Sequence, residues 1–205
     1  MEFIPFLIAA IALAITPGPG IAYVVARTVA GGRAEGFASC MGTALGGFVH
    51  VLAASLGLSL LIAQSALAFG VLKYVGAAYL VYLGIGMLRR KPVKLEAAEV
   101  PVEGARKALV QGVLVEALNV KTAMFFLAFL PQFVAHGQPL VPQLVLLGSI
   151  CVLCNTVVDV VCVLAAHRLL QSSVTGKQRA QWMNRISGCV MLVLAGFLAL
   201  ARRQV

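Results

Sequence analysis

The sequence is divided into six long apolar segments joined by short polar connections. Each segment is close to the roughly 20 residues that a helix needs to cross the hydrocarbon core of a bilayer. At that depth every backbone polar group must be satisfied within the protein, which a helix achieves along its own length. The pattern predicts an all-α, polytopic integral membrane protein, with about six transmembrane helices in one transporter domain over residues 1–205. The expected spans are Phe3–Thr28, Phe37–Ile62, Phe69–Leu88, Ala108–Phe133, Leu140–His167 and Met183–Ala201.

The composition supports a membrane protein and argues against two alternatives. Hydrophobic residues make up 61% of the 205 residues and charged residues only 11%, whereas a soluble domain is about half apolar. The first segment is preceded by Glu2 and no basic residue, so we expect a retained span and not a cleaved signal peptide. The basic residues that give the chain its net charge of +9 lie in short connections between the segments, so we expect contact with membrane lipid and no nucleic-acid partner.

Basic residues gather in the first, third and fifth connections, and the positive-inside rule therefore places these connections in the cytoplasm. The second and fourth connections are almost free of them, with Lys73 just inside the third segment. Both termini would then face outward. Arg202 and Arg203 argue against that, and a last segment that only partly inserts would resolve the conflict. The cytoplasmic basic residues are Arg27, Arg33, Arg89, Arg90, Lys91, Lys94, Arg106, Lys107, Arg168, Lys177, Arg179 and Arg185.

The third connection, residues 89–107, mixes basic residues with glutamates and contains Pro92 and Pro101. We interpret it as a solvated cytoplasmic linker between two halves, residues 1–90 and 106–205. Three spans per half would give the halves opposite orientations, as in transporters built from inverted repeats. This interpretation demands that a disturbance in the first span have a counterpart in the fourth.

The first span is interrupted by Thr16, Pro17, Gly18, Pro19 and Gly20. The prolines remove backbone donors and the glycines tolerate unusual backbone angles, so the helix should break there. Irregular backbone at membrane depth is tolerated only where protein buries it or a water-filled cavity receives it. Transporters commonly place ligands at such breaks. A ligand site and a proline kink with only a packing role both stay open.

The fourth span carries the expected counterpart in Glu116, Asn119 and Lys121, so we expect the first and the fourth helix both to be broken. A charged group inside hydrocarbon costs about 2.5–3.5 kcal/mol on insertion scales, so its presence usually has a functional cause. Glu116 and Asn119 are three residues apart and share a helix face. Lys121 would point elsewhere unless the helix unwinds near Asn119. The alternative is a Glu116–Lys121 pair buried for stability.

Two further titratable groups lie within the spans. Asp159, with Asn155 one turn before it, could bind a ligand or bridge helices. His50 could titrate during function or simply be hydrogen-bonded to a neighbour. The candidates for a proton-coupling role are therefore Glu116, Asp159 and His50.

The sequence argues against several other kinds of site. The cysteines lie in apolar segments, where a free thiol behaves as a small hydrophobe, and they indicate no disulfide framework. Cys151 and Cys154 have metal-like spacing but no partner ligands, so we expect no metal and no cofactor. There is no nucleophile elbow and no phosphate-binding loop, so we expect neither serine-hydrolase chemistry nor ATP hydrolysis by this chain.

Motifs in four of the six segments occur in an order that is similar to one known family. They are Ala14–Gly20, Gly42–His50 followed by Gly57-Leu58, Leu72–Leu80, Asn119–Ala123 followed by Phe125-Phe126, and Phe129–Phe133. These motifs resemble the signatures of the LysE/RhtB family of amino-acid exporters, or LysE-type translocators, and the resemblance covers essentially the whole chain. Many members have asparagine at the position of Gly20 and proline at that of Val120. The second departure should leave the fourth span more continuous.

The resemblance implies a secondary exporter, and not an enzyme, in the bacterial inner (cytoplasmic) membrane. It would move an amino acid or close derivative outward, driven by the proton gradient. Residues 16–20, Asn119 and Lys121 would then bind the substrate. We favour neutral amino acids, because Lys121 offsets one of the two carboxylates within the spans. A non-transporting membrane scaffold, an intramembrane enzyme using His50 with a serine, and a homo-oligomeric state stay open.

Overall fold

The computed structural model describes residues 3–64, 66–89, 101–135, 137–171 and 176–200, and within these ranges every regular element is a helix. This confirms the predicted all-α class. Most of the predicted linker, residues 90–100, lies outside the described residues. The elements are α1 (Phe3–Ile15), α2 (Pro19–Gln64), α3 (Ala66–Arg89), α4 (Ala105–Ala117), α5 (Val120–Phe129), the 3₁₀ turn η1 (Leu130–Phe133), α6 (Leu140–Gln171) and α7 (Gly176–Leu200).

Three helices are long and apolar enough to cross a membrane by themselves: α2, α3 and α6. The pair formed by α4 and the segment Val120–Phe133 passes the same test together, although it is bent by 47°. Apolar helices that are too short to span alone are Phe3–Ile15 and Arg185–Leu200. The chain is therefore a multi-pass membrane protein, as predicted, with three or four candidate spans by length and composition.

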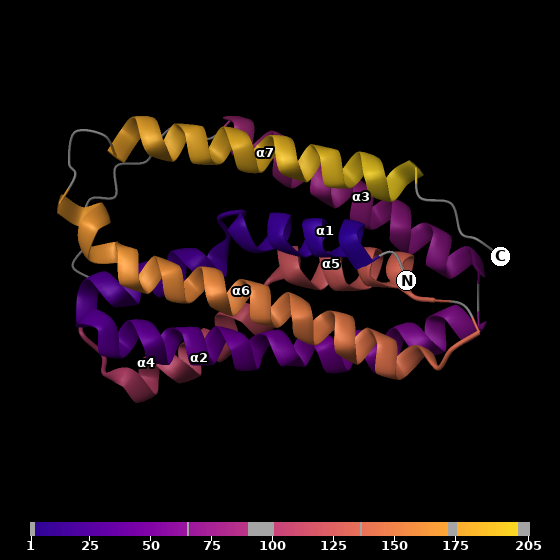
Figure 1. The fold of residues 1–205 in the computed structure, drawn as a ribbon, viewed down its shortest axis with the longest axis horizontal. Helices are drawn as coiled ribbons and strands as arrows, with labels where there is room; N and C mark the ends of the chain where they lie inside the picture. The colour runs from indigo at the N-terminus through magenta and orange to yellow at the C-terminus, as the bar shows by residue number, and fades with distance from the viewer. Residues whose placement is uncertain (1–2, 65, 90–100, 136, 172–175, 201–205) are drawn as a thin grey trace.

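The connection between the first two expected spans is a sharp turn inside α2. Gly32 adopts φ 71° and ψ −164°, a left-handed conformation that costs glycine little. The two parts of α2 then run back along each other, which Figure 1 shows at the left-hand end. A Cβ atom added to Gly20 would lie 3.9 Å from the Thr43 side chain, so residues far apart along α2 meet.

Helices of residues 3–89 run in directions opposite to those of helices at the same place in the order of residues 105–200 (Figure 1). α1 and the first part of α2 run from right to left, whereas α4 and α5 run from left to right. The second part of α2 opposes α6, and α3 opposes α7. The turn of α2, the end of α3 and the start of α4 all lie at the left-hand end.

Both expected helix breaks are present. α1 ends at Ile15 and α2 begins at Pro19, while α4 ends at Ala117 and α5 begins at Val120. The expectation that a missing proline leaves the fourth span more continuous was wrong. Asn119 has an extended backbone, and its side-chain oxygen accepts a hydrogen bond from the N–H of Lys121. Asparagine is a strong N-cap, so it starts a new helix without proline.

Glycines allow α2 to pack closely against α4. A Cβ atom at Gly42 of α2 would collide with the Leu109 carbonyl of α4, and one at Gly46 would lie 2.6 Å from the Val113 carbonyl. Small residues of this kind let helix backbones approach each other.

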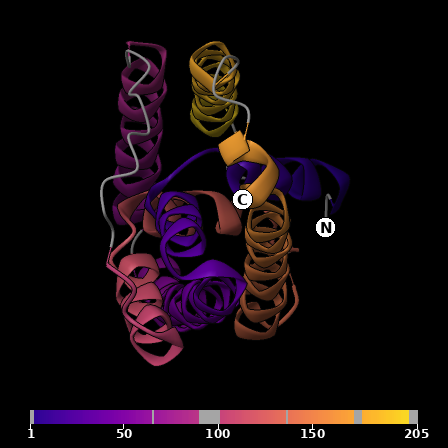
Figure 2. The same ribbon diagram turned by 90° about the vertical axis from the view of Figure 1, so that its left-hand side faces the viewer.

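Figures 1 and 2 both place α3 and α7 side by side at the edge of the bundle.

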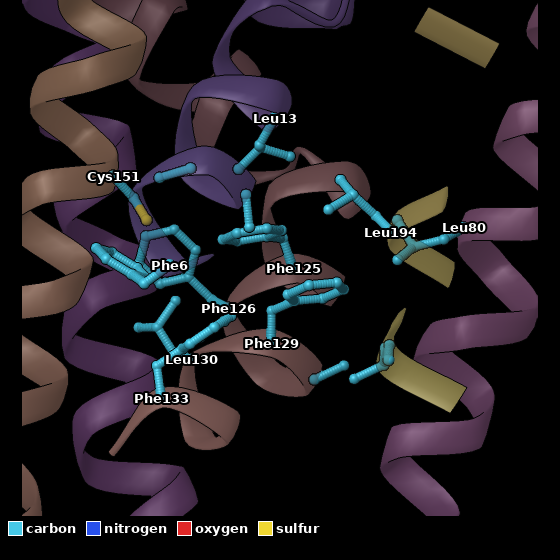
Figure 3. Packing of buried hydrophobic residues seen from close by; sticks show 14 of the residues in the cluster. Phe6, Leu13, Leu80, Phe125, Phe126, Phe129, Leu130, Phe133, Cys151 and Leu194 are labelled. Atoms are coloured by element: carbon cyan, nitrogen blue, oxygen red, sulfur yellow. The ribbon is translucent and has the colours of Figure 1, made fainter. Parts of the chain in front are cut away.

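An aromatic cluster holds α1 against α5 (Figure 3). The rings of Phe125 and Phe129 stack with centroids 4.9 Å apart, and the ring of Phe6 meets that of Phe133 edge-on at 5.5 Å. These four side chains are at most 2% exposed. Such aromatic pairs contribute about 0.5–1.5 kcal/mol each beyond their buried area. The cluster therefore fixes the start of α1 beside η1, at the end of α5.

Candidate functional site

A pocket lies where the two helix breaks meet. It is lined by the start of α2, the facing part of α2 near Thr43, the α4–α5 junction and the middle of α6. Its cavity volume is about 20 Å³, above the about 10–15 Å³ that one water molecule needs but too small for an amino acid. The pocket as described therefore has room for water but not for a substrate of amino-acid size. Its lining includes Gly20 and the polar residues Thr43, Glu116, Asn119, Lys121 and Asp159.

Lys121 binds the end of α1. Its Nζ donates hydrogen bonds to the carbonyl oxygens of Thr16 at 2.9 Å and Leu13 at 3.2 Å, and the residue is 7% exposed. A cation at a helix C-terminus is favourable, because the last carbonyls lack partners and carry partial negative charge. No ion pair joins Lys121 to Glu116 among the described contacts, so the pair envisaged as the structural alternative is not formed.

Glu116 and Asn119 lie on opposite sides of the second break and are bonded to each other. The Asn119 amide nitrogen donates to Glu116 Oε2 at 2.9 Å, and the Thr122 hydroxyl donates to Oε1 at 2.7 Å. Sequence reasoning did not find Thr122. It is six residues after Glu116, which on a continuous helix would face away. The break brings the two side chains together.

His50 does not line the pocket, but it supports the same junction. Its Nε2 lies 2.7 Å from the backbone oxygen of Glu116, in the last turn of α4. The ring also lies beside Phe126, with centroids 6.0 Å apart. His50 therefore contacts the backbone of Glu116 and not its carboxylate.

Asp159 is hydrogen-bonded by Thr43, which lies within the motif Gly42–His50 of the sequence. The Thr43 hydroxyl lies 2.9 Å from Asp159 Oδ2 and 3.0 Å from the carbonyl oxygen of Cys40. Asp159 is 4% exposed. Asp159 and Asn155, which lies one turn before it, both line the pocket. Thr43 could have been noticed as the polar position in a run of small residues.

The first break contributes backbone more than side chains. Thr16 turns its hydroxyl back to the Ala12 carbonyl at 2.6 Å. Pro17, Gly18 and Pro19 shape the break but do not line the pocket, whereas Gly20 does. A Cβ atom at Gly18 would lie 3.0 Å from Lys121 Nζ, and one at Gly20 would lie 2.8 Å from Glu116 Oε2. The two glycines leave room for the charged groups of Lys121 and Glu116.

A second polar cluster, which the sequence did not reveal, joins the turn of α2 to the residues before α4. Glu35 is 2% exposed and accepts hydrogen bonds from the N–H groups of Glu103 and Gly104 at 2.9 and 2.6 Å. Arg27 Nη1 lies 3.3 Å from carboxylate oxygens of both Glu35 and Glu103. A hydrogen bond from Lys107, helped by the Arg27 charge and opposed by burial, lowers the pKa of Glu103.

The arrangement of broken helices around a polar pocket fits membrane transport, and the family comparison decides the matter. The sequence model of one protein family, described as LysE type translocator, matches residues 11–202 of the chain. The chain belongs to the LysE type translocator family. This confirms the resemblance inferred from the motifs, and the protein is a translocator and not an enzyme.

Relatives of this translocator match along most of its length. A homoserine/homoserine lactone efflux protein of Salmonella typhimurium is 27% identical over 197 residues, 96% of this chain and 95% of the relative. A leucine efflux protein of Klebsiella pneumoniae is 27% identical over 135 residues, 65% of this chain and 64% of the relative. An uncharacterised membrane protein of Vibrio cholerae is 31% identical over 157 residues, 76% of each chain. No solved structure matches the chain significantly.

Proposed function

We propose that this translocator exports neutral amino acids or their close derivatives across the bacterial inner membrane, in exchange for protons. The observation that carries the proposal is the pocket between two helix breaks, which contains one lysine and two carboxylates. These groups are complementary to an amino acid, which carries one negative and one positive group.

The substrate carboxylate would bind between Lys121 and the start of α2. An ammonium group has three donors, and the carbonyls of Leu13 and Thr16 use two of those of Lys121. The N–H groups of Gly20 and Ile21 precede the first backbone bond of α2, from Ala22 to Gly18, and both residues line the pocket. Unpaired N–H groups at a helix N-terminus attract anions.

The substrate ammonium would bind on the opposite side, near the carboxylates of Glu116 and Asp159. With Lys121 charged, two carboxylates leave one net negative charge in the pocket. A neutral amino acid brings no further charge, which fits the efflux proteins for homoserine and leucine among the relatives. Glu116, Asp159 and His50 are the proposed candidates for proton coupling.

The architecture supports alternating access by two inverted halves, residues 1–90 and 106–205. The opposite directions of corresponding helices in Figure 1 support this symmetry, as does a break in the first element of each half. We retain six spans, counting α1 with the start of α2 as the first and α7 as the last. The end of the bundle that carries Arg27 and Lys107 would face the cytoplasm.

The function can be tested by efflux from loaded bacteria. Cells that produce the protein should release labelled homoserine or leucine faster than cells with an empty vector, and dissipating the proton gradient should abolish the difference. Labelled lysine should not respond. If lysine alone responds, the substrate class is wrong. If no amino acid in a wide panel responds, the protein is better explained as a membrane scaffold.

Homoserine lactone provides a matched probe for the binding mode, because it has an amine but no free carboxylate. Lys121→Met should reduce export of homoserine much more than export of the lactone. Equal losses for the two compounds would contradict the assignment of Lys121 to the substrate carboxylate.

A further inference from the structure

The two carboxylates of the pocket differ in how completely they are hydrogen-bonded. Both side chains are buried, Glu116 at 7% and Asp159 at 4% exposure. Each oxygen of Glu116 accepts a hydrogen bond. Asp159 accepts one at Oδ2, and no donor from the described part of the chain reaches its Oδ1. This difference separates their roles.

The hydrogen-bond donors around Glu116 favour its ionised state. The N–H of Lys121 donates to Asn119 Oδ1 at 3.1 Å, so the amide of Asn119 must turn its NH₂ group toward Glu116. A proton on Glu116 Oε2 would face that N–H. A proton on Oε1 would displace the Thr122 hydroxyl hydrogen, whose described acceptor is that oxygen. Protonation of Glu116 therefore leaves a buried donor without an acceptor, at a cost of about 1–3 kcal/mol.

Asp159 is satisfied in both protonation states, because Thr43 can reverse its role. The Thr43 hydroxyl has one hydrogen and two acceptors within reach, Asp159 Oδ2 at 2.9 Å and the Cys40 carbonyl at 3.0 Å. When Asp159 is ionised, the hydroxyl donates to it. When Asp159 is protonated, the carboxyl donates to Thr43 Oγ1, and the hydroxyl turns its hydrogen to the Cys40 carbonyl.

The titratable groups that face Asp159 come from every element packed around it. Lys121 of α5 and Glu116 of α4 act on it with opposite charges, and the thiols of Cys40 on α2 and Cys162 on α6 lie close to it. Lys121 is held by the α1 carbonyls, and Glu116 by its two donors. Asp159 is therefore the charged group of the pocket with a free oxygen and a reversible partner.

We propose that Asp159 exchanges one proton for the ammonium group of the substrate, with Thr43 as the residue that positions it in both states. This inference rests on the proposed export function. On the cytoplasmic side, the ammonium displaces the proton from Asp159 and the proton leaves to the cytoplasm. On the outer side, the amino acid departs and a proton from that side binds Asp159. One proton enters for each amino acid exported, and no covalent bond of the substrate changes.

The test measures proton release by the purified protein in weakly buffered detergent solution with a pH indicator. Addition of L-homoserine or L-leucine, whichever the wild type exports, should release about one proton per amino acid bound at a pH at which Asp159 is protonated. Glu116→Gln should bind more weakly but still release a proton per amino acid bound. Asp159→Asn should release none. Proton release by Asp159→Asn, or its loss in Glu116→Gln that still binds, would overturn the proposal.

The pH dependence of binding keeps the proposal testable if Asp159→Asn does not fold or bind. A single competing proton should weaken wild-type binding about tenfold for each pH unit below its midpoint. Thr43→Val should move this midpoint to higher pH, because the charged carboxylate loses its donor, and Thr43→Ser should restore it. An unmoved midpoint in Thr43→Val would contradict the proposal. A wild type that exports no amino acid would instead refute the function itself.

Discussion

The two helix breaks at the pocket are made by different means. The first, between α1 and α2, contains Pro17, Gly18 and Pro19, so the backbone chemistry of the chain ends the helix. The second, between α4 and α5, contains no proline and no glycine. There the side chain of Asn119 caps the new helix.

Each break is completed by a residue of the other half. Lys121, which follows the second break, binds the last carbonyls of α1 at the first. His50, from the second part of α2, binds the Glu116 carbonyl at the end of α4. A disturbance at one break should therefore be felt at the other.

The largest effect is expected for Gly18→Leu. A Cβ atom there lies 3.0 Å from Lys121 Nζ, so the longer side chain must displace the lysine and uncap α1. Gly18 has no positive φ, so the effect is steric. Export should fall to the background while protein remains in the membrane. The matched control is Gly86→Leu in α3, where nothing lies within 4 Å of an added Cβ. Normal export by Gly18→Leu would show that the first break is only a kink.

The next largest effect is expected for Lys121→Met, which keeps the length of the side chain and removes its charge. A hydrogen bond to a charged group contributes about 1.5–3 kcal/mol, so affinity should fall by roughly 10- to 100-fold. Measured substrate affinity and efflux rate should both show the loss. Lys73→Met in α3, a lysine outside the pocket, is the control. Equal effects of the two substitutions would remove Lys121 from the site.

A smaller effect is expected at the second break for Asn119→Ala. Loss of an N-cap costs about 1 kcal/mol, and Glu116 also loses a donor, so export should fall by roughly fivefold. Val120→Pro should be tolerated, because proline suits the first position of a helix and Asn119 is already extended, with ψ 99°. Thermal unfolding and efflux of the two variants give the comparison. Severe loss in Val120→Pro would show that this break needs the Val120 N–H.

The smallest effect is expected at Glu103, which lies in neither break. Its hydrogen bond with Lys107 lowers its pKa in the folded protein, so its contribution to stability is present above the pKa of the unfolded chain, about 4.3. The contribution is lost as the pH falls through the lower folded value. The melting temperature of Glu103→Gln should therefore differ less between pH 6 and pH 3 than that of the wild type does. Unchanged pH dependence would remove Glu103 from the acid response, and export at neutral pH should stay near that of the wild type.

Much of the fold could be predicted from local sequence properties. Apolar length determines that the chain enters a membrane, and Pro17, Gly18 and Pro19 break a helix in any surroundings, because their effect is confined to their own backbone. The polar positions Glu116, Asn119, Lys121 and Asp159 could be identified for the same reason, since burial of each in hydrocarbon is costly wherever it points. The sharp turn at Gly32 and the role of Asn119 as the cap of α5 could not, because glycine and asparagine are compatible with several local structures.

The partners of these residues were decided by the tertiary structure. Charge alone suggested that Lys121 pairs with Glu116, but the break turns the lysine toward carbonyls of α1, and Glu116 binds Asn119 and Thr122. Thr43 joins Asp159 across 116 residues of sequence, and Glu35 binds backbone N–H groups before α4. Hydrogen bonds depend on distance and direction between groups that only packing brings together, so the sequence by itself determined which polar groups are buried, whereas the folded arrangement determined what each of them binds.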